Sequence, residues 1–456
     1  MSSSECVSLF RAVYFLTSLQ HLEIWLTSMR HALERPPIRR RPTRLCIGYW
    51  LVTWLATGAW AQKRLTWEEA KREFEATNPT LRATRIGVEE ARADEITAHL
   101  RPNPDFSVSV DQLTPFTGKP YRPFQFYLPS ASLGYLVERR HKRDLRLASA
   151  QGATAIATSQ LADQERGLLF DLRAAFMQVL QQKAVLAVTR ESLAYYDRVL
   201  EVSRDRLQVG DIAQVDLDRL ELQRVQFETD VQTALVNLRT AKIQFRALLN
   251  DYTPIDKLDI IGPFDFQELA MTPDQFRMAA LDNRPDLRAA IQAVAKAKTD
   301  YQLAKANGST DPTIGWGLGS EAPDIPPFIG VSVSIPLRIF DRNQGEKLRT
   351  RLDVGRNERL VDATKAQIVS DVDSAFAAIE TNLTLLRPYK ARYLKQAAGV
   401  RETISFSYQH GGASLLDFLE AQQGFRSIQL SYVNLVGAFL TAAAQMNLAV
   451  GTEVIQ

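Results

Sequence analysis

The chain has 456 residues, 45% of them hydrophobic, and a formal net charge of +3. A chain of this length can bury one large core or two ordinary domains. Because the charges are mixed in sign and nearly balanced, the composition argues against a protein that binds nucleic acid through a long basic surface.

The first 61 residues differ from the rest of the chain. The basic block "RPPIRRRPTR" (35–44) precedes the apolar run "LCIGYWLVTWLATG" (45–58), and the small residues of "AWAQ" permit cleavage after Ala61. This layout predicts a secretory signal peptide. An uncleaved anchor is the alternative, but the run is shorter than the ~20 residues that span a membrane. Residues 1–61 are therefore expected to be an N-terminal extension and signal peptide, and the start codon, Met1 or Met29, stays open.

Cysteine occurs only upstream of the predicted cleavage site, at Cys6 and Cys46. The mature chain is therefore expected to lack disulfides, thiolate metal sites and cysteine nucleophiles. Its three histidines, His99, His141 and His410, are far apart in sequence, and no metal-ligand or phosphate-loop spacing stands in a suitable context. The sequence thus predicts no catalytic residue, no cofactor and no metal site, and we expect a protein that is not an enzyme.

Two halves of the mature chain repeat the same features at similar intervals. Pro285 follows Pro79 by 206 residues, and Gly411 follows Gly210 by 201 residues. Repeated spacing of this kind indicates an internal duplication. The expected domains are a first repeat (62–250), a proline-rich linker or belt (251–272) and a second repeat (273–456).

Each repeat begins with a helical stretch, near Trp67–Leu100 in the first and Pro273–Asn307 in the second. After it, apolar residues alternate with small or polar ones, which predicts strands. The four expected strands lie near 105–113, 131–138, 313–321 and 328–336. A half-buried sheet of a soluble protein shows the same alternation. In a secreted chain, however, segments of ~10 residues with a face of glycine and serine are typical of outer-membrane barrels.

A long helical stretch follows each pair of strands, at about 141–208 and about 345–409. The first would span roughly 100 Å, and Pro388 is expected to kink the second. A glycine break then leads to a shorter helix, Val215–Asn250 or Leu415–Val450. The apolar spacing and abundant alanine suit coiled-coil contacts. The opening helix and the shorter helix, each ~35 residues long, are expected to stack end to end along the long one.

Four strands are too few to close a membrane barrel, since single-chain barrels begin at about eight strands. An open sheet edge in lipid leaves backbone groups unpaired. If these strands enter a membrane, several copies of the chain must therefore share one barrel, and a cyclic oligomer supplies the closure.

At this point the chain resembles a known family, the TolC-type outer-membrane efflux proteins. The branch that serves heavy-metal and other cation exporters is the more similar one. The resemblance covers residues 62–456 and rests on the two-fold repeat, on "NRPDLRAA" (283–290), "VERRHKR" (137–143) and "SIPLRIFDRNQGE" (334–346), and on the turns "QVGD" and "QHGG". At the first strand-to-helix junction the family often has a proline and a Gly-Gly pair, where this chain has Leu136, Arg139, Arg140 and His141.

The resemblance implies a mainly α fold with a small β part: a homotrimer with a shared twelve-stranded membrane β-barrel and a tunnel of long helices, an α-barrel, in the periplasm. It implies the outer-membrane channel of a tripartite efflux system, a passive exit duct served by a periplasmic adaptor and an inner-membrane pump. Contact with outer-membrane lipid follows, and no nucleic-acid partner is expected. The alternative is a periplasmic coiled-coil adaptor or scaffold, which would lack the four strands.

The resemblance also suggests site residues. It places both glycine turns at the periplasmic tip, where glycine accepts the positive φ that ends a helix. The candidates for adaptor docking are Val209, Gly210, Asp211, His410, Gly411 and Gly412. Asp417 and Glu420 match acidic positions that line the family's pore constriction, and Asp216 holds the place of Asp417 in the first repeat. Rings of carboxylates favour cations, whereas a solvated helix face is the alternative, and the exported substrate, metal ion or drug, stays open.

Overall fold

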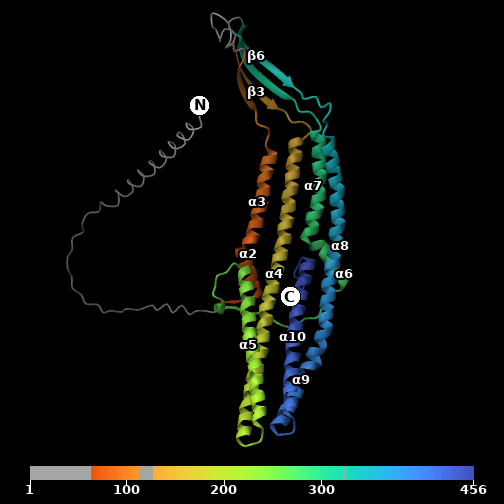
Figure 1. Cartoon of the computed structure of the whole chain (residues 1–456). Helices are drawn as coiled ribbons and strands as arrows, with labels where there is room; N and C mark the ends of the chain where they lie inside the picture. Colours follow the sequence, from red (N-terminus) through yellow and green to blue (C-terminus); the bar gives the residue numbers. More distant parts are fainter. Residues whose placement is uncertain (1–62, 112–126, 322–324, 456) are drawn as a thin grey trace, which may run out of the picture. The chain divides into compact units, whose positions relative to one another are not determined.

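The computed structural model of the chain describes residues 63–111, 127–321 and 325–455. The expected signal peptide, within residues 1–61, lies outside the described residues. In the part that is described, long helices dominate, accompanied by a four-stranded and a two-stranded sheet (Figure 1). The expected mainly α fold with a small β part is confirmed.

The elements follow the same order in both halves. The first half contains β1 (Lys63–Leu65), α2 (Trp67–Thr77), α3 (Pro79–His99), β2 (Asp105–Asp111), β3 (Leu128–Leu136), α4 (Lys142–Gln208) and α5 (Gln214–Leu248). A 3-10 turn (Ile255–Lys257) and β4 (Leu258–Ile260) come next. The second half contains α6 (Pro273–Asn283), α7 (Pro285–Asn307), β5 (Thr313–Glu321), β6 (Ile325–Ser334), α8 (Gln344–Pro388), a π-helical turn (Tyr389–Tyr393), α9 (Leu394–Gln409) and α10 (Leu415–Val450).

Each opening stretch is two helices, so the expectation of one continuous helix is wrong. Pro79 has no N–H to donate, and the residue before a proline disfavours the helical conformation. Asn78 therefore leaves the helix and caps the next one, its side chain accepting a hydrogen bond from the N–H of Leu81 at 3.0 Å. Arg284 and Pro285 produce the same break between α6 and α7.

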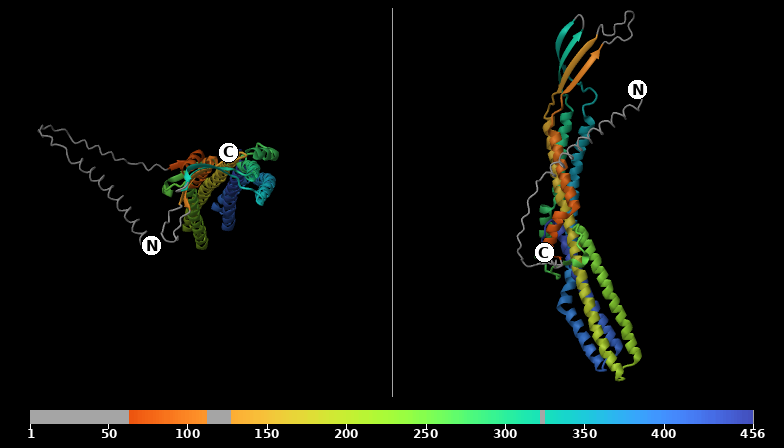
Figure 2. Two further views of the ribbon diagram at one scale, coloured as in Figure 1. Left: turned by 90° about the horizontal axis from the view of Figure 1, so that it is seen from above. Right: turned by 90° about the vertical axis from the view of Figure 1, so that its left-hand side faces the viewer.

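The helices lie side by side in two tiers. Near the four-stranded sheet the order is α3, α4, α7, α8, and at the far end it is α5, α4, α10, α9. α4 runs through both tiers, with α3 packed along its first part and α5 along its last part, as expected from the helix lengths. Figure 2 shows the sheet at one end of these helices and the two helix-to-helix turns at the other.

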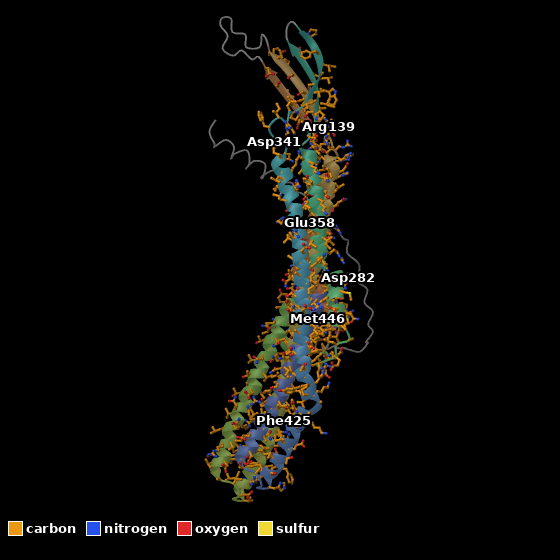
Figure 3. All side chains as sticks on the ribbon, turned by 90° about the vertical axis from the view of Figure 1, so that its right-hand side faces the viewer. Arg139, Asp282, Asp341, Glu358, Phe425 and Met446 are labelled. Carbon is orange, nitrogen blue, oxygen red and sulfur yellow. The ribbon has the colours of Figure 1, made fainter. Side chains whose placement is uncertain are left out.

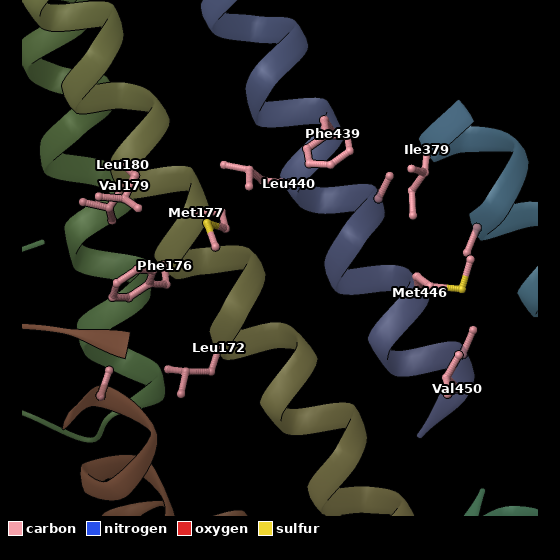
Figure 4. Packing of buried hydrophobic residues seen from close by; sticks show 14 of the residues in the cluster. Leu172, Phe176, Met177, Val179, Leu180, Ile379, Phe439, Leu440, Met446 and Val450 are labelled. Carbon is pink, nitrogen blue, oxygen red and sulfur yellow. The ribbon is translucent and has the colours of Figure 1, made fainter. Parts of the chain in front are cut away.

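The main core lies where the two repeats meet, midway along α4. Leu172 and Phe176 of α4 and Phe439 and Met446 of α10 are at most 1% exposed (Figure 4). Burial of apolar surface contributes ~25 cal/mol per Å², so this cluster fastens the repeats together. A smaller cluster around Phe418 lies nearer the turns.

α10 is the one helix, among the residues described, that is long and apolar enough to cross a membrane. However, 61% of its most apolar 18-residue window is buried inside the structure. It packs against α4 and α8, so its apolar character is accounted for by the core between the repeats.

The segment 251–272, here called the belt, contains a strand that the sequence analysis missed. β4 pairs in parallel with β1, which begins the described chain. Carboxylates of β4 and of the rest of the belt bind cations on helices of both repeats. These ion pairs are Asp259–Lys183 (2.8 Å), Asp265–Lys390 (2.5 Å) and Glu268–Arg387 (2.6 Å). The belt therefore joins α4 of the first repeat to the long helix of the second.

Pro388 does not end that long helix. The chain passes through the π-helical turn Tyr389–Tyr393 and continues as α9. π-helical turns are rare and occur mostly as single turns inside α-helices, and here the turn follows a proline, which interrupts the regular hydrogen-bond ladder by lacking an N–H. Arg387 and Lys390, which form ion pairs with Glu268 and Asp265 of the belt, lie on either side of Pro388. The belt therefore binds the long helix at its irregular turn.

Asp251 fastens the start of the belt to β1. Lys63 and the Thr253 hydroxyl donate hydrogen bonds to its carboxylate at 2.9 and 2.8 Å. Burial alone would raise the pKa of Asp251, but these hydrogen bonds outweigh burial and lower the pKa from 3.8 to about 2. Since the folded-state pKa lies below the unfolded one, the carboxylate stabilises the fold above pH 3.8, and that stability is lost as the pH falls toward 2.

We therefore expect Asp251→Asn to lower the stability at pH 7 by at most about 1 kcal/mol, because solvent screens a partly exposed pair. The difference from the parent protein should shrink between pH 4 and pH 2, as measured by thermal unfolding followed by circular dichroism. Asp256→Asn is the matched control, because Asp256 is exposed and lies 3.7 Å from Arg239. A loss for Asp251→Asn that stays constant across this pH range would contradict the prediction.

The first strand-to-helix junction has an unusual backbone. Arg140 and His141 both have positive φ, 57° and 55°, a conformation that is strained for residues with a Cβ. Glycines would adopt it freely, which explains the Gly-Gly pair common in the family that the sequence resembles. Here the next residue, Lys142, is buried and donates to Asp311 at 2.6 Å. This ion pair ties the junction to the segment that precedes β5.

Candidate functional site

The four-stranded sheet is antiparallel, with the strand order β2-β3-β5-β6. The two repeats therefore meet at the pair β3 and β5, and β2 and β6 are edge strands whose outer sides have no partner strand within the described residues. In register, Phe106, Leu133, Trp316 and Val331 form one row across all four strands.

The two faces of this sheet differ in chemistry. One face is apolar and largely exposed: Phe106 (71%), Val108 (66%), Leu318 (61%), Ile329 (77%) and Val331 (70%). The opposite face is formed largely by short side chains: Ser107, Ser109, Ser130, Ser132, Gly315, Gly317, Gly330 and Ser332. Ser107 bonds Ser132 at 2.8 Å and Ser109 bonds Ser130 at 2.9 Å, while Phe328 is an exception that covers Gly319. A water-exposed apolar face of this extent marks a binding or membrane surface.

The two glycine turns have the same hydrogen-bond pattern. In the first, Gly210 (φ 80°) donates to Leu207 at 3.0 Å and Asp211 donates to Arg206 at 2.9 Å. In the second, Gly411 (φ 76°) and Gly412 donate to the equivalent carbonyls, those of Tyr408 and Ser407, at 3.2 and 2.7 Å. This pair of bonds defines the Schellman motif, which needs a left-handed residue after the helix. Val209 and His410 hold the preceding position, and both turns lie at the far end from the sheet.

The acidic residue six places after each glycine has a local cause. Asp216 and Asp417 are both the third residue of the following helix, where a negative charge is favourable. Asp417 and Ser414 form a capping box, with Ser414 Oγ donating to the carboxylate at 2.7 Å. Hydrogen bonds from the Ser414 side chain and backbone lower the pKa of Asp417. The position of this acid in the first helical turn therefore has a local cause in both hairpins, although only Asp417 belongs to a capping box, since the N-cap residue of α5 is Ala213.

Glu420 has no such local partner. It is exposed and lines a cavity of about 480 Å³ between α4, α5 and α10. Asp216 lies 3.7 Å from Arg219 on its own helix. Asp417 and Glu420 stand one turn apart on α10, so the structure places them on one stretch of helix near the second turn.

Contacts between the two turn-bearing hairpins were missed by the sequence analysis. Arg206, just before the first turn, donates to the backbone carbonyl of Tyr408 at 2.8 Å and to Asp211 at 2.7 Å. Its guanidinium lies over the Tyr408 ring at 5.3 Å, and its side chain is 14% exposed. Nothing in the local pattern pairs positions 202 residues apart, so only the fold reveals this link.

Further contacts continue the link away from the tip. Tyr195 of α4 donates to Ser405 of α9 at 2.7 Å. Arg401 of α9 lies over the Tyr195 ring of α4 at 4.8 Å and over Phe425 of its own hairpin at 3.7 Å, and Figure 3 shows Phe425 on the turn side of Met446. Where the main core does not reach, these polar and cation–π contacts join the hairpins together with the smaller apolar cluster around Phe418.

Comparison with known proteins decides the identity of this arrangement. The outer membrane efflux protein family matches residues 72–250 and 277–452, well over half of the chain. The chain belongs to the outer membrane efflux protein family. The resemblance noted from the sequence is confirmed.

Individual members of the family are distant in sequence but similar in fold. The cobalt-zinc-cadmium resistance protein CzcC of Cupriavidus metallidurans is 22% identical over 395 residues, which cover 85% of this chain and 90% of CzcC. The crystal structure of CusC has a TM-score of 0.73 at 15% identity and covers 91% of this chain and 99% of CusC. The open state of the Neisseria gonorrhoeae channel MtrE has a TM-score of 0.69 at 15% identity and covers 85% of this chain and 89% of MtrE.

As a member of this family, the chain is the outer-membrane channel component of a tripartite efflux system, located in the outer membrane and extending into the periplasm. The family works as a trimeric channel with an adaptor and an inner-membrane pump, and its members are channels and not enzymes. The alternative of a periplasmic adaptor or scaffold is therefore set aside. Within the described residues, no group of three or more His, Cys, Asp or Glu side chains could hold a metal ion.

Proposed function

We propose that three copies of the chain join their sheets into one twelve-stranded barrel, with β6 of each copy beside β2 of the next. The observation that carries this is the combination of two open edges with an exposed apolar face. In lipid each unpaired backbone group costs several kcal/mol, and a cyclic arrangement pairs every edge. The apolar face then contacts outer-membrane lipid, and the serine and glycine face lines the bore.

Native mass spectrometry of the mature chain, extracted with detergent from outer membranes, tests this closure. We expect a mass three times that of the subunit, and extraction that requires detergent. Quantitative release of a monomer with the soluble periplasm would overturn the proposal.

The sides of the helical bundle support the same arrangement. α3 and α5 lie along one side and α8 and α9 along the other. Each exposes large apolar residues: Ile86 and Ile96 on α3, Leu222, Val225 and Val236 on α5, Leu348, Leu352 and Leu360 on α8, and Val400 and Phe406 on α9. Exposed apolar side chains on both sides fit head-to-tail contact between neighbouring copies, which would continue the barrel as a tunnel of helices.

The two Schellman turns are the proposed docking site for the periplasmic adaptor. Val209 is 81% exposed, and a Cβ built on Gly210 or Gly411 would meet no atom within 4 Å. The docking residues are Val209, Gly210, Asp211, His410, Gly411 and Gly412. A partner helix tip can thus approach the backbone of both turns closely, and docking there would act directly on the Arg206 link between the hairpins.

We further propose that Asp216, Asp417 and Glu420 form negative rings near the tip when three copies assemble. Rings of carboxylates favour cations in a pore. The relative CzcC, named for cobalt, zinc and cadmium resistance, supports a cationic substrate. The duct would then be most attractive to cations at its periplasmic entrance.

Removing the charges of this ring while keeping the helix cap is expected to weaken cation preference. Asp417→Asn retains an oxygen that accepts from Ser414, and Glu420→Gln keeps the side-chain length. In planar bilayers with a potassium chloride gradient, the double variant should show a roughly twofold or larger fall in the ratio of cation to anion permeability, because the ring's field favours cations.

Asp282→Asn provides the control, since Asp282 is an exposed acid of α6, on the sheet side of Met446 and far from the turns (Figure 3). It should leave the permeability ratio unchanged. An unaltered ratio in the Asp417→Asn, Glu420→Gln variant would count against the ring. Alanine at position 417 is less informative, because it also removes the acceptor of the capping-box hydrogen bonds from Ser414.

A further inference from the structure

A cavity of about 550 Å³ lies where the start of α2, the middle of α4 and the end of α10 meet. Its volume falls in the range of small-molecule sites. Apolar side chains from several elements line it: Ala162, Leu169, Phe170, Pro263, Ala444, Leu448 and Ile455. The cavity is separate from the four-stranded sheet and from the two glycine turns.

Polar groups of this cavity largely satisfy one another. Lys71 and Glu453 form an ion pair at 2.9 Å. The Asn447 side chain binds the backbone of Val454 and Ile455 at 2.6–2.9 Å. Arg166 forms an ion pair with Asp163 at 2.6 Å, and Glu165 lies 4.0 Å from Arg85. Glu68 is exposed to solvent.

Two donors at the cavity have no acceptor. The guanidinium of Arg173 lies over the Trp67 ring at 4.4 Å, and it forms no ion pair or hydrogen bond with the residues that the structure describes. The indole N–H of Trp67 is buried without a hydrogen-bond partner. Burial lowers the pKa of Arg173, although Glu453 and Glu68 partly oppose this. A desolvated cation and a buried N–H are each costly to leave unpaired.

This pair of donors does not belong to the duplicated framework. α2 and α6 begin 206 residues apart, and α4 and α8 begin 202 residues apart. At these offsets Trp67 corresponds to Pro273 and Arg173 to Ala375, which is 2% exposed. The second repeat therefore builds the same helices without either donor, so the fold itself does not require them.

We propose that this cavity binds a small carboxylate joined to an apolar chain or ring. The planar fork of a guanidinium matches a carboxylate with two parallel hydrogen bonds, and the Trp67 ring on which the guanidinium lies supports it at the cavity wall. The apolar part of the ligand would lie along the leucine, phenylalanine and proline side chains of the wall. A fatty acid and the carboxyl end of a peptide with an apolar last residue share this chemistry.

Isothermal titration of the purified full-length oligomer with N-acetylphenylalanine and with decanoate tests the proposal. At least one of the two acids should bind, and the one that binds more tightly identifies the source. For N-acetylphenylalanine, the neutral amide of the same compound should bind at least tenfold more weakly. Arg173→Met should weaken binding of the acid at least tenfold, and Trp67→Phe, which puts a smaller ring without an N–H under the guanidinium, should weaken it severalfold.

Arg190→Met is the matched control, because Arg190 is an exposed arginine of the same helix. It should bind the acids as the parent protein does. If Arg173→Met does not assemble, Arg173→Lys keeps the charge without the fork and should still bind more weakly. No binding of either acid, equal binding of acid and amide, or equal binding by the parent and the Arg173 variants would overturn the proposal.

Discussion

Replacing Val331 with arginine is expected to prevent stable assembly of the channel in the membrane. Val331 lies in the edge strand β6, is 70% exposed, and stands in the apolar row opposite Trp316. An arginine facing lipid costs ~2–4 kcal/mol at the middle of the bilayer, and each trimer would carry three. We expect most of the heat-resistant oligomer to be lost from the outer-membrane fraction, as measured by semi-native gel electrophoresis.

Ser332→Arg is the control for this experiment. Ser332 is the next residue of the same strand, and its side chain therefore points to the opposite face, which we assign to the bore. Water in the bore can solvate an arginine there, so the oligomer should persist. If both variants assemble equally well, the assignment of the apolar face to lipid is wrong.

Arg206→Ala is expected to raise the conductance of the channel about two- to tenfold. Arg206 joins the hairpins through the Tyr408 carbonyl and the Tyr408 ring. A hydrogen bond to a charged group contributes about 1.5–3 kcal/mol, enough to shift a balance between closed and open tips more than tenfold in each subunit. Single-channel recording in planar bilayers measures the effect.

Two variants separate this link from general damage to the tip. Arg204→Ala removes an exposed arginine whose ion pair with Glu221 stays within the first hairpin. Tyr408→Phe removes a hydroxyl that is buried without a partner and keeps the ring and the carbonyl. Both should conduct like the parent protein. A conductance of Arg206→Ala equal to that of the parent would show that the hairpins are held closed by other contacts.

The fold could be predicted from the sequence where the signal is local and repeated. Alternation around Val331 and Ser332 identified a sheet with two unlike faces, and proline-free stretches such as that of α4 identified the long helices. The glycines at 210 and 411 marked both turns, because a left-handed residue after a helix is strongly restricted to glycine. These features depend on a few neighbouring residues each.

The features that were missed depend on residues far apart in sequence or on competing local effects. The break at Asn78 was overlooked because the hydrophobic pattern continues across Pro79, although the proline forbids a continuous helix. β1 and β4 are three residues long, too short for a periodic signal. The link from Arg206 to Tyr408 and the stack of Arg173 on Trp67 arise only when distant segments meet.

The candidate site was predicted unevenly for the same reason. The positions of the turn residues followed from glycine chemistry, but the matching acids at 216 and 417 suggested a pore where the favourable place of a negative charge in the first turn of a helix already accounts for their spacing. Glu420, which caps nothing, is therefore the more informative acid of the three. Sequence alone could not separate these roles, because both place a carboxylate near the start of a helix.

The serine and glycine face of the sheet has a consequence for what can leave the cell. Because these side chains are short, the width of the barrel bore would be set mainly by the backbone of the strands. Few side-chain groups would be in a position to select among passing solutes. The barrel part of the conduit would then have little means to recognise its cargo. Discrimination among solutes would rest with the acidic residues proposed at the periplasmic entrance and with whatever loads the conduit, and one exit could serve cargoes that differ widely in size.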